Sequence, residues 1–476
     1  MSILSAEGIA FDVKVPVVII GAGAAGLVAA LSAREVGQDI LVLERDAVPR
    51  GSTALSAGLI PAPGTRWQKA AGIVDSPELF GRDIAAKASG EPDPLLLDTV
   101  TTAIGPTLEW LADHHDLPFS VIEDFRYPGH SVCRMHGLPT RSGTELVDRL
   151  RGAADRVSVD LLCDARVTSL FAEPDGRVVG VEVERPDGTK ERIGCVMLIL
   201  ACNGYGGNKD LVQRYIPELG NALYFGHEGN QGDALLWGQA LGAATRHLSG
   251  HQGHGSVAHP HGILITWATI TEGGFQVNLR GERFSDESHG YSEQAAVVLR
   301  QPEGLAWTVF DARIAGIARQ FEDFRQAEAL GAIVTAETVE ELARQTSLPV
   351  DSLKSTFKEI DELKLAGELD HFGRNFVGAP PLQSPYHAVR VTGALFHTQG
   401  GLVVDGNARV MRRNGTALPN LFAVGGAACG VSGSTAEGYL SGNGLLSAVA
   451  LGRVAGLATA RAGMMLPRAD QSVPRV

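Results

Sequence analysis

One segment near the start restricts the fold more than any other part of the sequence. Residues 15–20 form a short, continuous apolar run, typical of a strand buried on both faces, which ends at Gly21-Ala-Gly-Ala-Ala-Gly26. An Ala- and Leu-rich stretch, residues 27–36, follows, and a second apolar run, residues 40–43, ends at Glu44. This order predicts two parallel strands joined by a helix, the beginning of an α/β fold.

The glycine spacing indicates what this turn can bind. Gly21 permits a tight turn from strand to helix, Gly23 lets a pyrophosphate approach the backbone, and Gly26 lets the helix pack closely on the strand. Free amides and the positive end of the helix dipole then form an anion site without any lysine. Glu44 stands where an acid accepts hydrogen bonds from ribose hydroxyls. Together these elements predict a bound dinucleotide, either NAD or FAD.

The residues after Glu44 favour FAD over NAD. Arg45 leads into residues 50–58, Arg-Gly-Ser-Thr-Ala-Leu-Ser-Ala-Gly, a run dominated by small side chains. Such a loop suits the close passage of a second, bulkier part of the ligand.

Composition excludes several other classes of protein. Of the 476 residues 44% are hydrophobic, so the chain can bury a large core, and about 150 residues per domain gives roughly three units. The 41 Lys and Arg against 54 Asp and Glu give a formal charge of −13, which argues against a nucleic-acid partner. Five scattered cysteines without a Cys-x-x-Cys pair offer neither a disulfide framework nor ligands for haem or iron-sulfur clusters.

We expect a cytoplasmic protein without a membrane partner. The cysteine pattern fits a reducing compartment, and the first residues lack the basic and apolar regions of a secretory signal. Residues 15–33 are uncharged and would score as a membrane span by hydropathy, but their glycines indicate the nucleotide turn instead.

The remaining pattern predicts two domains. We expect one domain from residues 1–250 and 392–476, and an inserted domain from residues 251–391, where the composition changes. Helices are expected at residues 95–116, 143–156, 292–300, 311–330, 336–365 and 443–460, and strands within 157–200, 401–404 and 421–424. The tail, residues 464–476, is expected to be loose because it carries two prolines and alternating charges.

Further motifs follow in order along nearly the whole chain. Besides residues 21–26 and 51–58, they are Asn203-Gly-Tyr-Gly-Gly-Asn208, Gly232-Asp233, Gly281-Glu-Arg-Phe-Ser-Asp-Glu287, His397-Thr-Gln-Gly-Gly401, Leu421-Phe-Ala-Val-Gly425, Gly442-Asn443 and Gly452-Arg-Val-Ala-Gly456. With them the chain resembles the flavoprotein family of succinate dehydrogenase and fumarate reductase, including its 3-ketosteroid dehydrogenase branch. The resemblance implies a Rossmann-like, GR2-type FAD-binding domain built from both ends of the chain. An inserted α+β capping domain would hold the substrate at the junction, over the flavin.

The resemblance also implies which residues hold the FAD. They are Gly21, Gly23, Ala25, Gly26, Glu44, Arg45, Ser52, Thr53, Ala54, Ser56, Gly58, Val167, Asn203, Gly204, Asp233, Gly425, Gly442, Asn443, Leu445 and Leu446.

Two departures from the family pattern bear on the cofactor. Membrane-bound succinate dehydrogenases attach their flavin through a histidine in the loop that matches residues 51–58, and no histidine occurs there, so FAD is expected to be noncovalent. The acidic residue that follows Ala-x-Gly in the family is replaced by Gly426, so one ribitol contact must come from elsewhere.

Two tyrosines occupy positions where fumarate reductases carry arginine. In those enzymes one arginine protonates the substrate a few residues beyond Gly-x-Arg-Phe-x-x-Glu, and another binds a carboxylate just before the C-terminal Gly-Asn. The matching residues here are Tyr291 and Tyr439. A phenol offers one donor and no charge, so the pair lacks the bidentate grip of guanidinium groups on a dicarboxylate. Fumarate is therefore a poor candidate substrate.

Both tyrosines lie in patterns similar to those of ketosteroid dehydrogenases. Glu287-Ser-His-Gly-Tyr291 is similar to their Glu-Ser-x-x-Tyr, and Tyr439-Leu440-Ser441 to the Tyr-x-Ser of enzymes that oxidise the bond between carbons 4 and 5 of 3-ketosteroids. The resemblance implies that one hydroxyl polarises the ketone, another removes the α proton, and the flavin takes hydride from the β carbon. We assign Tyr291 as the base. Tyr439 with Ser441 is then the carbonyl polariser or a partner that shares the proton.

Other features of these candidates leave alternatives open. A spacing of two places Tyr439 and Ser441 on one face of an extended segment. His397 aligns with a family histidine that touches substrate, or else it satisfies backbone groups beside the hinge. A phenol with a pKa near ~10 is a weak base at neutral pH, so the site must favour phenolate through a donor or cation. A single tyrosine is more often a packing residue than a catalyst, but tyrosine at two aligned positions favours the catalytic interpretation.

Two further groups of residues invite a functional interpretation. The histidines at 247, 251, 254, 259 and 261 do not match a compact zinc pattern, so a solvated or pocket-lining loop is favoured and no metal is predicted. The aromatic residues Trp267, Phe275, Trp307 and Phe310 could line an apolar pocket, but most of them are expected in the core of the inserted domain.

The leading interpretation is an FAD-dependent oxidoreductase of the CH–CH class that forms a C=C bond beside a ketone, with an external electron acceptor. The ketone could be a steroid, a single ring such as an oxocyclohexane carboxylate, or linear. The alternatives are an enoate reductase similar to fumarate reductase, which runs the same transition state in reverse, and a non-catalytic flavin-binding protein. The oligomeric state is left open.

Overall fold

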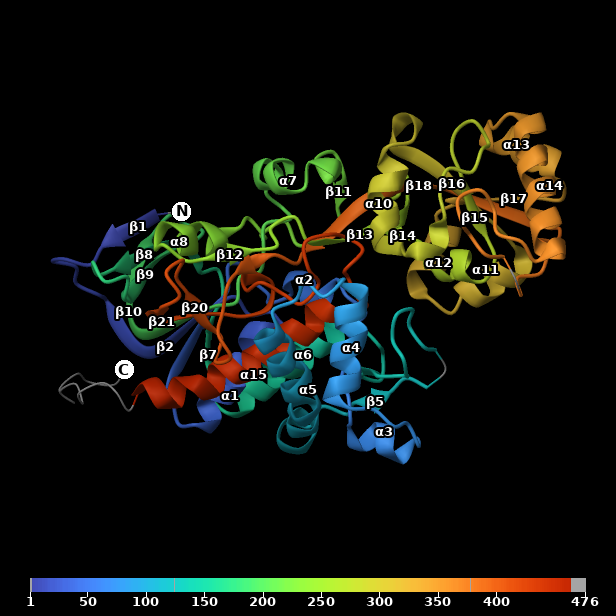
Figure 1. Cartoon of the computed structure of the whole chain (residues 1–476). Helices are drawn as coiled ribbons and strands as arrows, with labels where there is room; N and C mark the ends of the chain where they lie inside the picture. Colours follow the sequence, from blue (N-terminus) through green and yellow to red (C-terminus); the bar gives the residue numbers. More distant parts are fainter. Residues whose placement is uncertain (1, 124, 377, 464–476) are drawn as a thin grey trace. The chain divides into compact units, whose positions relative to one another are not determined.

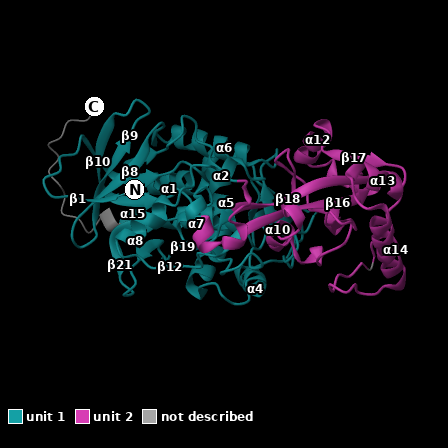
Figure 2. Cartoon of the chain, turned by 90° about the horizontal axis from the view of Figure 1, so that it is seen from above, with its two compact units in different colours: residues 1–211, 226–251, 397–476 teal, residues 212–225, 252–396 magenta. Residues whose placement is uncertain are grey.

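The computed structural model describes residues 2–123, 125–376 and 378–463, so the expected loose tail lies outside the described residues. The chain divides into two compact units (Figure 2). Unit 1 comprises residues 1–211, 226–251 and 397–476, and unit 2 comprises residues 212–225 and 252–396. Residues 212–225 were expected with the first domain. They group with unit 2 because β11 (Leu223–Tyr224) pairs with β18 (Tyr386–Thr398).

A mixed sheet forms the centre of unit 1. Its strand order is β1-β8-β9-β10-β2-β3-β7, and β2 (Val13–Ile20) pairs in parallel with both β3 (Ile40–Leu43) and β10 (Lys190–Leu200). The first half of β10 pairs antiparallel with β9 (Val178–Glu184), and its last residues pair in parallel with β21 (Ala417–Ala423). The amino- and carboxy-terminal parts of the chain therefore complete one sheet.

Helices α1 (Ala24–Glu35) and α15 (Asn443–Gly463) pack tightly against each other in unit 1 (Figure 1). A Cβ at Gly452 would lie 2.6 Å from the carbonyl oxygen of Ala25, and one at Gly456 would overlap that of Ala29. The glycines of this motif thus allow the two backbones to approach. Among the described residues α15 is the one helix long and apolar enough to span a membrane, but α1 and α5 pack against it, as expected of a core helix.

The other elements of unit 1 surround this sheet and helix pair. They are β1 (Ser2–Ser5), α2 (Gly51–Ala54), β4 (Ile60–Pro61), α3 (Arg66–Ala70), α4 (Pro77–Lys87), α5 (Pro94–His115), β5 (Ser120–Val121), β6 (Met135–Gly137), α6 (Gly143–Arg156), β7 (Asp160–Leu162), β8 (Arg166–Ala172), α8 (Asp233–Ala240), β12 (Thr245–Arg246), β19 (Gly401–Leu402) and β20 (Arg409–Met411). Helix α7 (Lys209–Tyr215) begins in unit 1 and continues into unit 2.

Unit 2 is built on a second sheet of order β14-β13-β18-β16-β15, with β11 and β17 also pairing with β18. Its apolar core includes Phe275, Trp307 and Phe310. The elements are β13 (His251–Ala258), β14 (Ile263–Leu264), α9 (Ala268–Thr271), β15 (Phe275–Val277), η2 (Glu287–His289), α10 (Tyr291–Leu299), β16 (Leu305–Asp311), α11 (Ala312–Ala318), α12 (Glu322–Ala329), β17 (Ile333–Ala336), α13 (Val339–Thr346) and α14 (Val350–Ala366).

Most of the expected helices and strands are present, but two segments that were each expected to form one long helix form two shorter ones. The helix expected at 336–365 is divided into α13 and α14, because Ser347 adopts a left-handed φ of 59° that ends α13 and Pro349 precedes α14. The helix expected at 311–330 is divided into α11 and α12, and the extended backbone of Phe321 separates them.

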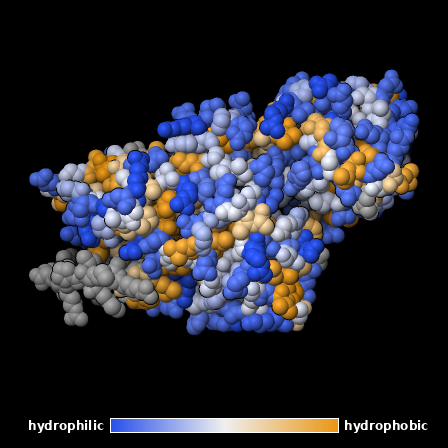
Figure 3. Space-filling model, in the orientation of Figure 1, coloured by the Kyte–Doolittle hydropathy of each residue, from blue (hydrophilic) through white to orange (hydrophobic). Residues whose placement is uncertain are grey.

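On the face of the molecule shown in Figure 3, apolar side chains form separate patches among polar ones. The most exposed large apolar residues of the described chain include Val74 and Leu365, at 87% and 81% exposure. Scattered exposed apolar side chains of this kind are ordinary and mark no binding surface by themselves.

Candidate functional site

The glycine turn of unit 1 has the geometry that its spacing predicts. Gly21 adopts a φ of 105°, and a Cβ there would lie 2.6 Å from the carbonyl oxygen of Ala201. A Cβ at Gly26 would overlap the carbonyl oxygen of Gly21, so only glycine lets α1 sit this close to β2. Beside Gly23 the one atom within 4 Å of a Cβ is Thr53 Oγ1. The middle glycine therefore leaves its backbone accessible.

Glu44 closes the same end of the sheet. Its carboxylate accepts hydrogen bonds from the amides of Ala22, at 2.8 Å, and Asp46, at 3.1 Å. Burial raises the pKa of Glu44, although these two amides act in the opposite direction. Next to it, the Arg45 guanidinium donates to the carbonyl oxygen of Gly229 at 2.8 Å. The acid is thus held at the turn by backbone groups on both sides of the strand end.

The loop of small residues forms the short helix α2 beside the turn. Thr53 Oγ1 accepts a hydrogen bond from the Ala24 amide at 3.1 Å, and Ser52 Oγ accepts one from Asn230 Nδ2 at 2.8 Å. Ser56 Oγ donates to the Thr53 carbonyl at 2.7 Å. A Cβ at Gly58, whose φ is 65°, would lie 2.7 Å from Ser142. The loop, with Ala54 in α2, is therefore fixed against α1 and α6.

The structure explains the glycine that departs from the family pattern. Asn203 has a φ of 64°, and its side-chain oxygen accepts from the Gly204 amide at 2.8 Å. A Cβ at Gly426 would overlap that oxygen, and one at Gly204 would overlap Thr398 Oγ1. No side chain fits at residue 426 while Asn203 keeps this position. Gly425, with a φ of 56°, lies beside Ala25 of α1.

The buried polar atoms of unit 1 without a hydrogen-bond partner among the described residues include Asp233 Oδ1, Asn443 Oδ1 and Ser447 Oγ. Asp233 and Asn443 are predicted cofactor residues, whereas Ser447, one turn along α15, was missed because a helical serine carries no motif signal. Burial raises the pKa of Asp233. Buried polar atoms without partners are costly, so they indicate a polar ligand. Together with the glycine cradle, they fit the hydroxyl-rich chain and phosphates of FAD.

The remaining predicted cofactor residues contribute apolar or backbone surface. Val167 in β8 and Leu446 in α15 are buried in the core of unit 1, and Leu445 packs partly against it. Gly442 adopts a φ of 89° immediately before α15, and a Cβ there would lie 2.6 Å from Pro61 Cδ.

Tyr439 and His397 lie together in unit 1. Their ring centroids are 5.5 Å apart and nearly perpendicular. His397 Nδ1 lies 2.6 Å from Gln399 Nε2 and 3.4 Å from the Thr398 carbonyl oxygen, and the side-chain oxygen of Gln399 accepts from Ser432 Oγ. Burial lowers the pKa of His397 to about 4. A neutral histidine beside a phenol provides hydrogen-bonding capacity without positive charge.

The Tyr439 hydroxyl meets the start of α15. Burial raises the pKa of Tyr439 above its usual range, although hydrogen bonds from the amides of Gly442 and Gly444 act in the opposite direction. The phenol therefore keeps its proton at neutral pH. Tyr439 and Leu440 belong to no helix or strand, and Ser441 lies in the turn before α15. The Ser441 carbonyl oxygen accepts a hydrogen bond from His130 Nε2 at 3.0 Å.

Tyr291, the predicted base, belongs to unit 2 and begins α10 after Gly290. The turn before it is anchored by Glu287, which is 1% exposed and forms ion pairs with Arg283 at 2.6 Å and Arg374 at 2.9 Å. Its Oε1 also accepts from the Gln276 amide at 2.7 Å. Glu287 thus fixes the segment before Tyr291 through these internal ion pairs and this hydrogen bond.

The model of the FAD binding domain family matches residues 16–445 of this chain. The chain belongs to this family. This flavoprotein is 30% identical over 442 residues to a "Probable fumarate reductase" of Shewanella frigidimarina, strain NCIMB 400, which covers 92% of this chain and 74% of the relative. A urocanate reductase of Eggerthella lenta is 25% identical over 463 residues, 94% of this chain and 75% of the relative.

Solved structures agree with this membership. The open conformation of a flavocytochrome c3 fumarate reductase superimposes with a TM-score of 0.83 at 29% identity, covering 95% of this chain and 79% of that one. The 3-ketosteroid-Δ4-(5α)-dehydrogenase of Rhodococcus jostii RHA1, in complex with 4-androstene-3,17-dione, gives a TM-score of 0.76 at 25% identity, covering 97% and 100%. The expected fold class, FAD and oxidoreductase chemistry on CH–CH groups are confirmed.

Sequence reasoning missed a buried ionic network in unit 1 of the flavoprotein. Arg134 forms ion pairs with Asp75, at 2.9 Å, and Asp83, at 2.5 Å, and its guanidinium lies 3.5 Å from His130 Nδ1. His130 then donates to the Ser441 carbonyl, and burial lowers the pKa of His130 to about 4. The network ends on the segment that carries Tyr439. The two acids lie 59 and 51 residues before Arg134, so no spacing in the sequence reveals the network.

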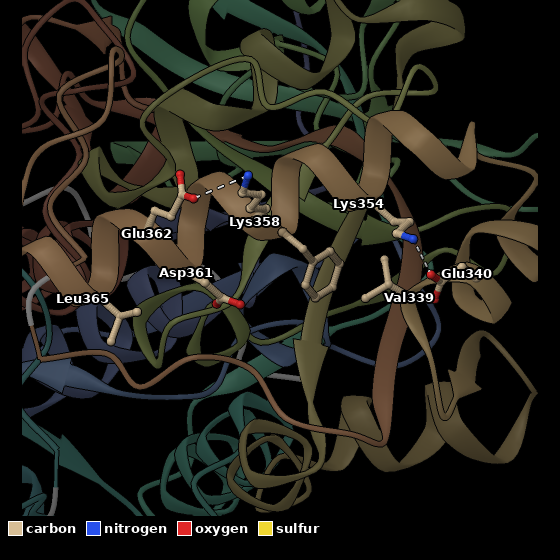
Figure 4. A pocket seen from close by; sticks show the side chains of 8 residues that line it. Val339, Glu340, Lys354, Lys358, Asp361, Glu362 and Leu365 are labelled. Atoms are coloured by element: carbon tan, nitrogen blue, oxygen red, sulfur yellow. Dashed lines mark ion pairs between the residues drawn. The ribbon is translucent and has the colours of Figure 1, made fainter.

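The five histidines do not form one solvated loop: His259 and His261 are exposed in the turn after β13, as expected of such a loop, but two others are buried. His251 and His254 lie in β13 and are buried, and no three His, Cys, Asp or Glu side chains of the described chain gather as a metal site would require. A hollow of about 360 Å³ along α13 and α14 is lined by two ion pairs, Lys354–Glu340 and Lys358–Glu362 (Figure 4). Four of its charged side chains pair with each other, and none of the predicted site residues lines it.

Proposed function

We propose that this flavoprotein oxidises the carbon–carbon bond α,β to a ketone, with a cyclic ketone such as a 3-ketosteroid or an oxocyclohexane compound as substrate. The observation that carries the proposal is Tyr439, a buried phenol that keeps its proton at neutral pH and lies at the start of α15 beside neutral His397. An uncharged donor suits a ketone oxygen better than a carboxylate.

The charges of unit 2 support a ketone over a dicarboxylate. Arg283 donates to Glu287, Asp370 and the Ser285 carbonyl. Arg374 donates to Glu287 and to the carbonyls of Ile270 and Gly274. The two guanidinium groups that hold Glu287 are therefore committed to internal partners, which leaves neither of them for a substrate carboxylate.

The proposed roles divide the proton chemistry between two phenols. Tyr439 donates a hydrogen bond to the ketone oxygen, with Ser441 as a second hydroxyl, and so stabilises the negative charge that develops there. Tyr291 removes the proton from the α carbon. FAD, when bound by the glycine cradle and the orphaned oxygens of unit 1, supplies the acceptor for hydride from the β carbon. An external acceptor must then reoxidise the protein.

Reduction of an enoate is the second candidate, because the similar proteins include reductases of fumarate and urocanate. Both directions pass through the same transition state, so the same residues serve either reaction.

The two directions separate in an anaerobic titration of the purified, oxidised flavoprotein. We expect a cyclic ketone to bleach the flavin absorption band and the α,β-unsaturated ketone to appear in equal amount. Tyr439→Phe should bind FAD normally and bleach slowly. Two results together would establish the reductase instead. No ketone in a panel of steroid and single-ring compounds would bleach the flavin, and an unsaturated carboxylate would reoxidise the chemically reduced protein.

A further inference from the structure

Four rings from four separate segments of unit 2 stack in a column that ends at Tyr291. The centroid of Phe225 lies 4.7 Å from that of Phe396, which lies 5.4 Å from that of His254, and the imidazole lies 4.9 Å from the ring of Tyr291. The three interplanar angles are 15°, 24° and 20°. Trp267 meets the edge of both His254 and Tyr291, at 5.6 Å and 6.3 Å.

His254 is an uncharged member of this column with a defined tautomer. Its Nδ1 accepts a hydrogen bond from the Ser256 amide at 3.1 Å, so the proton of the neutral ring is on Nε2. Burial lowers the pKa of His254 to about 3. The ring is held by the Ser256 amide and by the aromatic faces of Phe396 and Tyr291 on either side.

The backbone beneath the column is equally restricted. The Gly253 amide donates to Ser292 Oγ at 3.0 Å, and a Cβ at Gly253 would lie 2.6 Å from that of Ala295. A Cβ at Gly255 would lie 2.7 Å from Gln294 Cβ. Strand β13 therefore packs against the first turns of α10 on both sides of His254, so the backbone that carries the histidine is held against the helix that Tyr291 begins.

We propose that His254 is a positioning residue whose ring, stacked between Phe396 and Tyr291, holds the Tyr291 phenol in one orientation for proton transfer. The catalytic part of this inference rests on the proposed function, whereas the orientation of the Tyr291 ring does not. A flat ring at position 254 is sufficient for the role, because the imidazole acts through its face and not through its charge.

Two substitutions at the same position test the proposal. His254→Phe keeps a flat ring, and His254→Ala removes it. We expect kcat for ketone oxidation to fall about tenfold to a hundredfold in His254→Ala with little change in KM, because misplacement of a reacting group slows chemistry more than binding. His254→Phe should retain kcat within about threefold. Equal loss in both variants, or wild-type kcat in His254→Ala, would refute the proposal.

A matched control removes a similar histidine elsewhere in unit 2. His387 is also buried and stacks on Phe310 at 5.6 Å, and burial lowers its pKa. His387→Ala should lower the melting temperature to a similar extent as His254→Ala and leave kcat unchanged. If His387→Ala lowers kcat as strongly, the effect of His254→Ala is a general loss of stability and the positioning role is wrong.

A second measurement needs no substrate, so it separates failure of this inference from failure of the proposed function. The seven tyrosines are replaced by 3-fluorotyrosine, and Tyr291→Phe identifies the resonance of Tyr291 in the fluorine NMR spectrum. We expect one narrow line in the wild type and in His254→Phe, and a shifted or broadened line in His254→Ala. An unchanged line in His254→Ala refutes the positioning role whatever the substrate proves to be.

Discussion

Replacement of Tyr439 by phenylalanine removes one oxygen from a ring whose other contacts stay in place. The ring is 8% exposed and keeps its edge contact with His397 in the variant. The lost hydroxyl takes with it hydrogen bonds to the amides of Gly442 and Gly444. One hydrogen bond contributes about 0.5–1.5 kcal/mol to stability, so the free energy of unfolding should fall by about 1 to 3 kcal/mol.

The effect on turnover should exceed the effect on stability. Loss of one donor to a developing oxyanion costs about 10²–10³ in kcat, equivalent to roughly 3–4 kcal/mol. We expect this loss in the rate of flavin bleaching by a ketone, measured by anaerobic stopped-flow absorbance, with the FAD content unchanged. Tyr386→Phe is the control, because it removes a phenol that packs on Phe357 in unit 2. A Tyr439→Phe variant that bleaches as fast as Tyr386→Phe would return Tyr439 to a packing role.

Three further changes test other parts of the structure. In Gly26→Ala the new methyl group would overlap the Gly21 carbonyl, so the purified protein should lose most of its FAD and show a lower ratio of flavin to protein absorbance. Gly316→Ala is the control and should retain its FAD, because no atom lies within 4 Å of a Cβ at that position. Arg134→Met should lower the free energy of unfolding, measured in urea, by about 3–5 kcal/mol because Asp75 is left as an unpaired buried charge. The double variant Arg134→Met/Asp75→Asn should regain much of this stability if the unpaired charge is the cause. Burial lowers the pKa of His136 from 6.5 to about 4, so the stability that the neutral ring contributes is complete above pH 6.5 and falls by about 3 kcal/mol as the pH drops towards 4. The free energy of unfolding, measured for the wild type and His136→Gln at pH 7.5 and 4.5, should depend less on pH in the variant. An equal pH dependence in both proteins would contradict this assignment.

Local patterns in the sequence were sufficient to predict the nucleotide turn, but not the packing of α15 on α1, which joins the two ends of the chain. The sequence of residues 15–44 predicts the strand, turn, helix and strand that they form, because each glycine is required by backbone geometry within the same segment. The departure at Gly426 was recognised, but its reason was not, because Asn203, the side chain that needs the space, lies more than two hundred residues earlier.

The surroundings of the candidate catalytic residues could not be predicted in the same way. A motif predicts Tyr291, whereas its stacking partner His254 was expected in a solvated or pocket-lining loop, because Gly253 and Gly255 hide the pattern of a buried strand. His130 donates a hydrogen bond to the backbone carbonyl of Ser441, and any residue at position 441 would offer this carbonyl, so the residue type does not predict the contact. The roles of Tyr291, Tyr439, Ser441 and His397 stay predictions until the variants are measured.

The two-sided pairing of β10 has a consequence for synthesis of the protein. A ribosome produces β9, β2 and β10 early, but β21 and α15 emerge some two hundred residues later. Until then the end of β10 has an open edge, and α1 lacks the helix that covers it. Such long-range closure is slow and leaves apolar surface exposed in the nascent chain. Uptake of the cofactor should therefore be a late, post-translational event, and chaperones that protect open sheet edges should improve the yield of yellow protein.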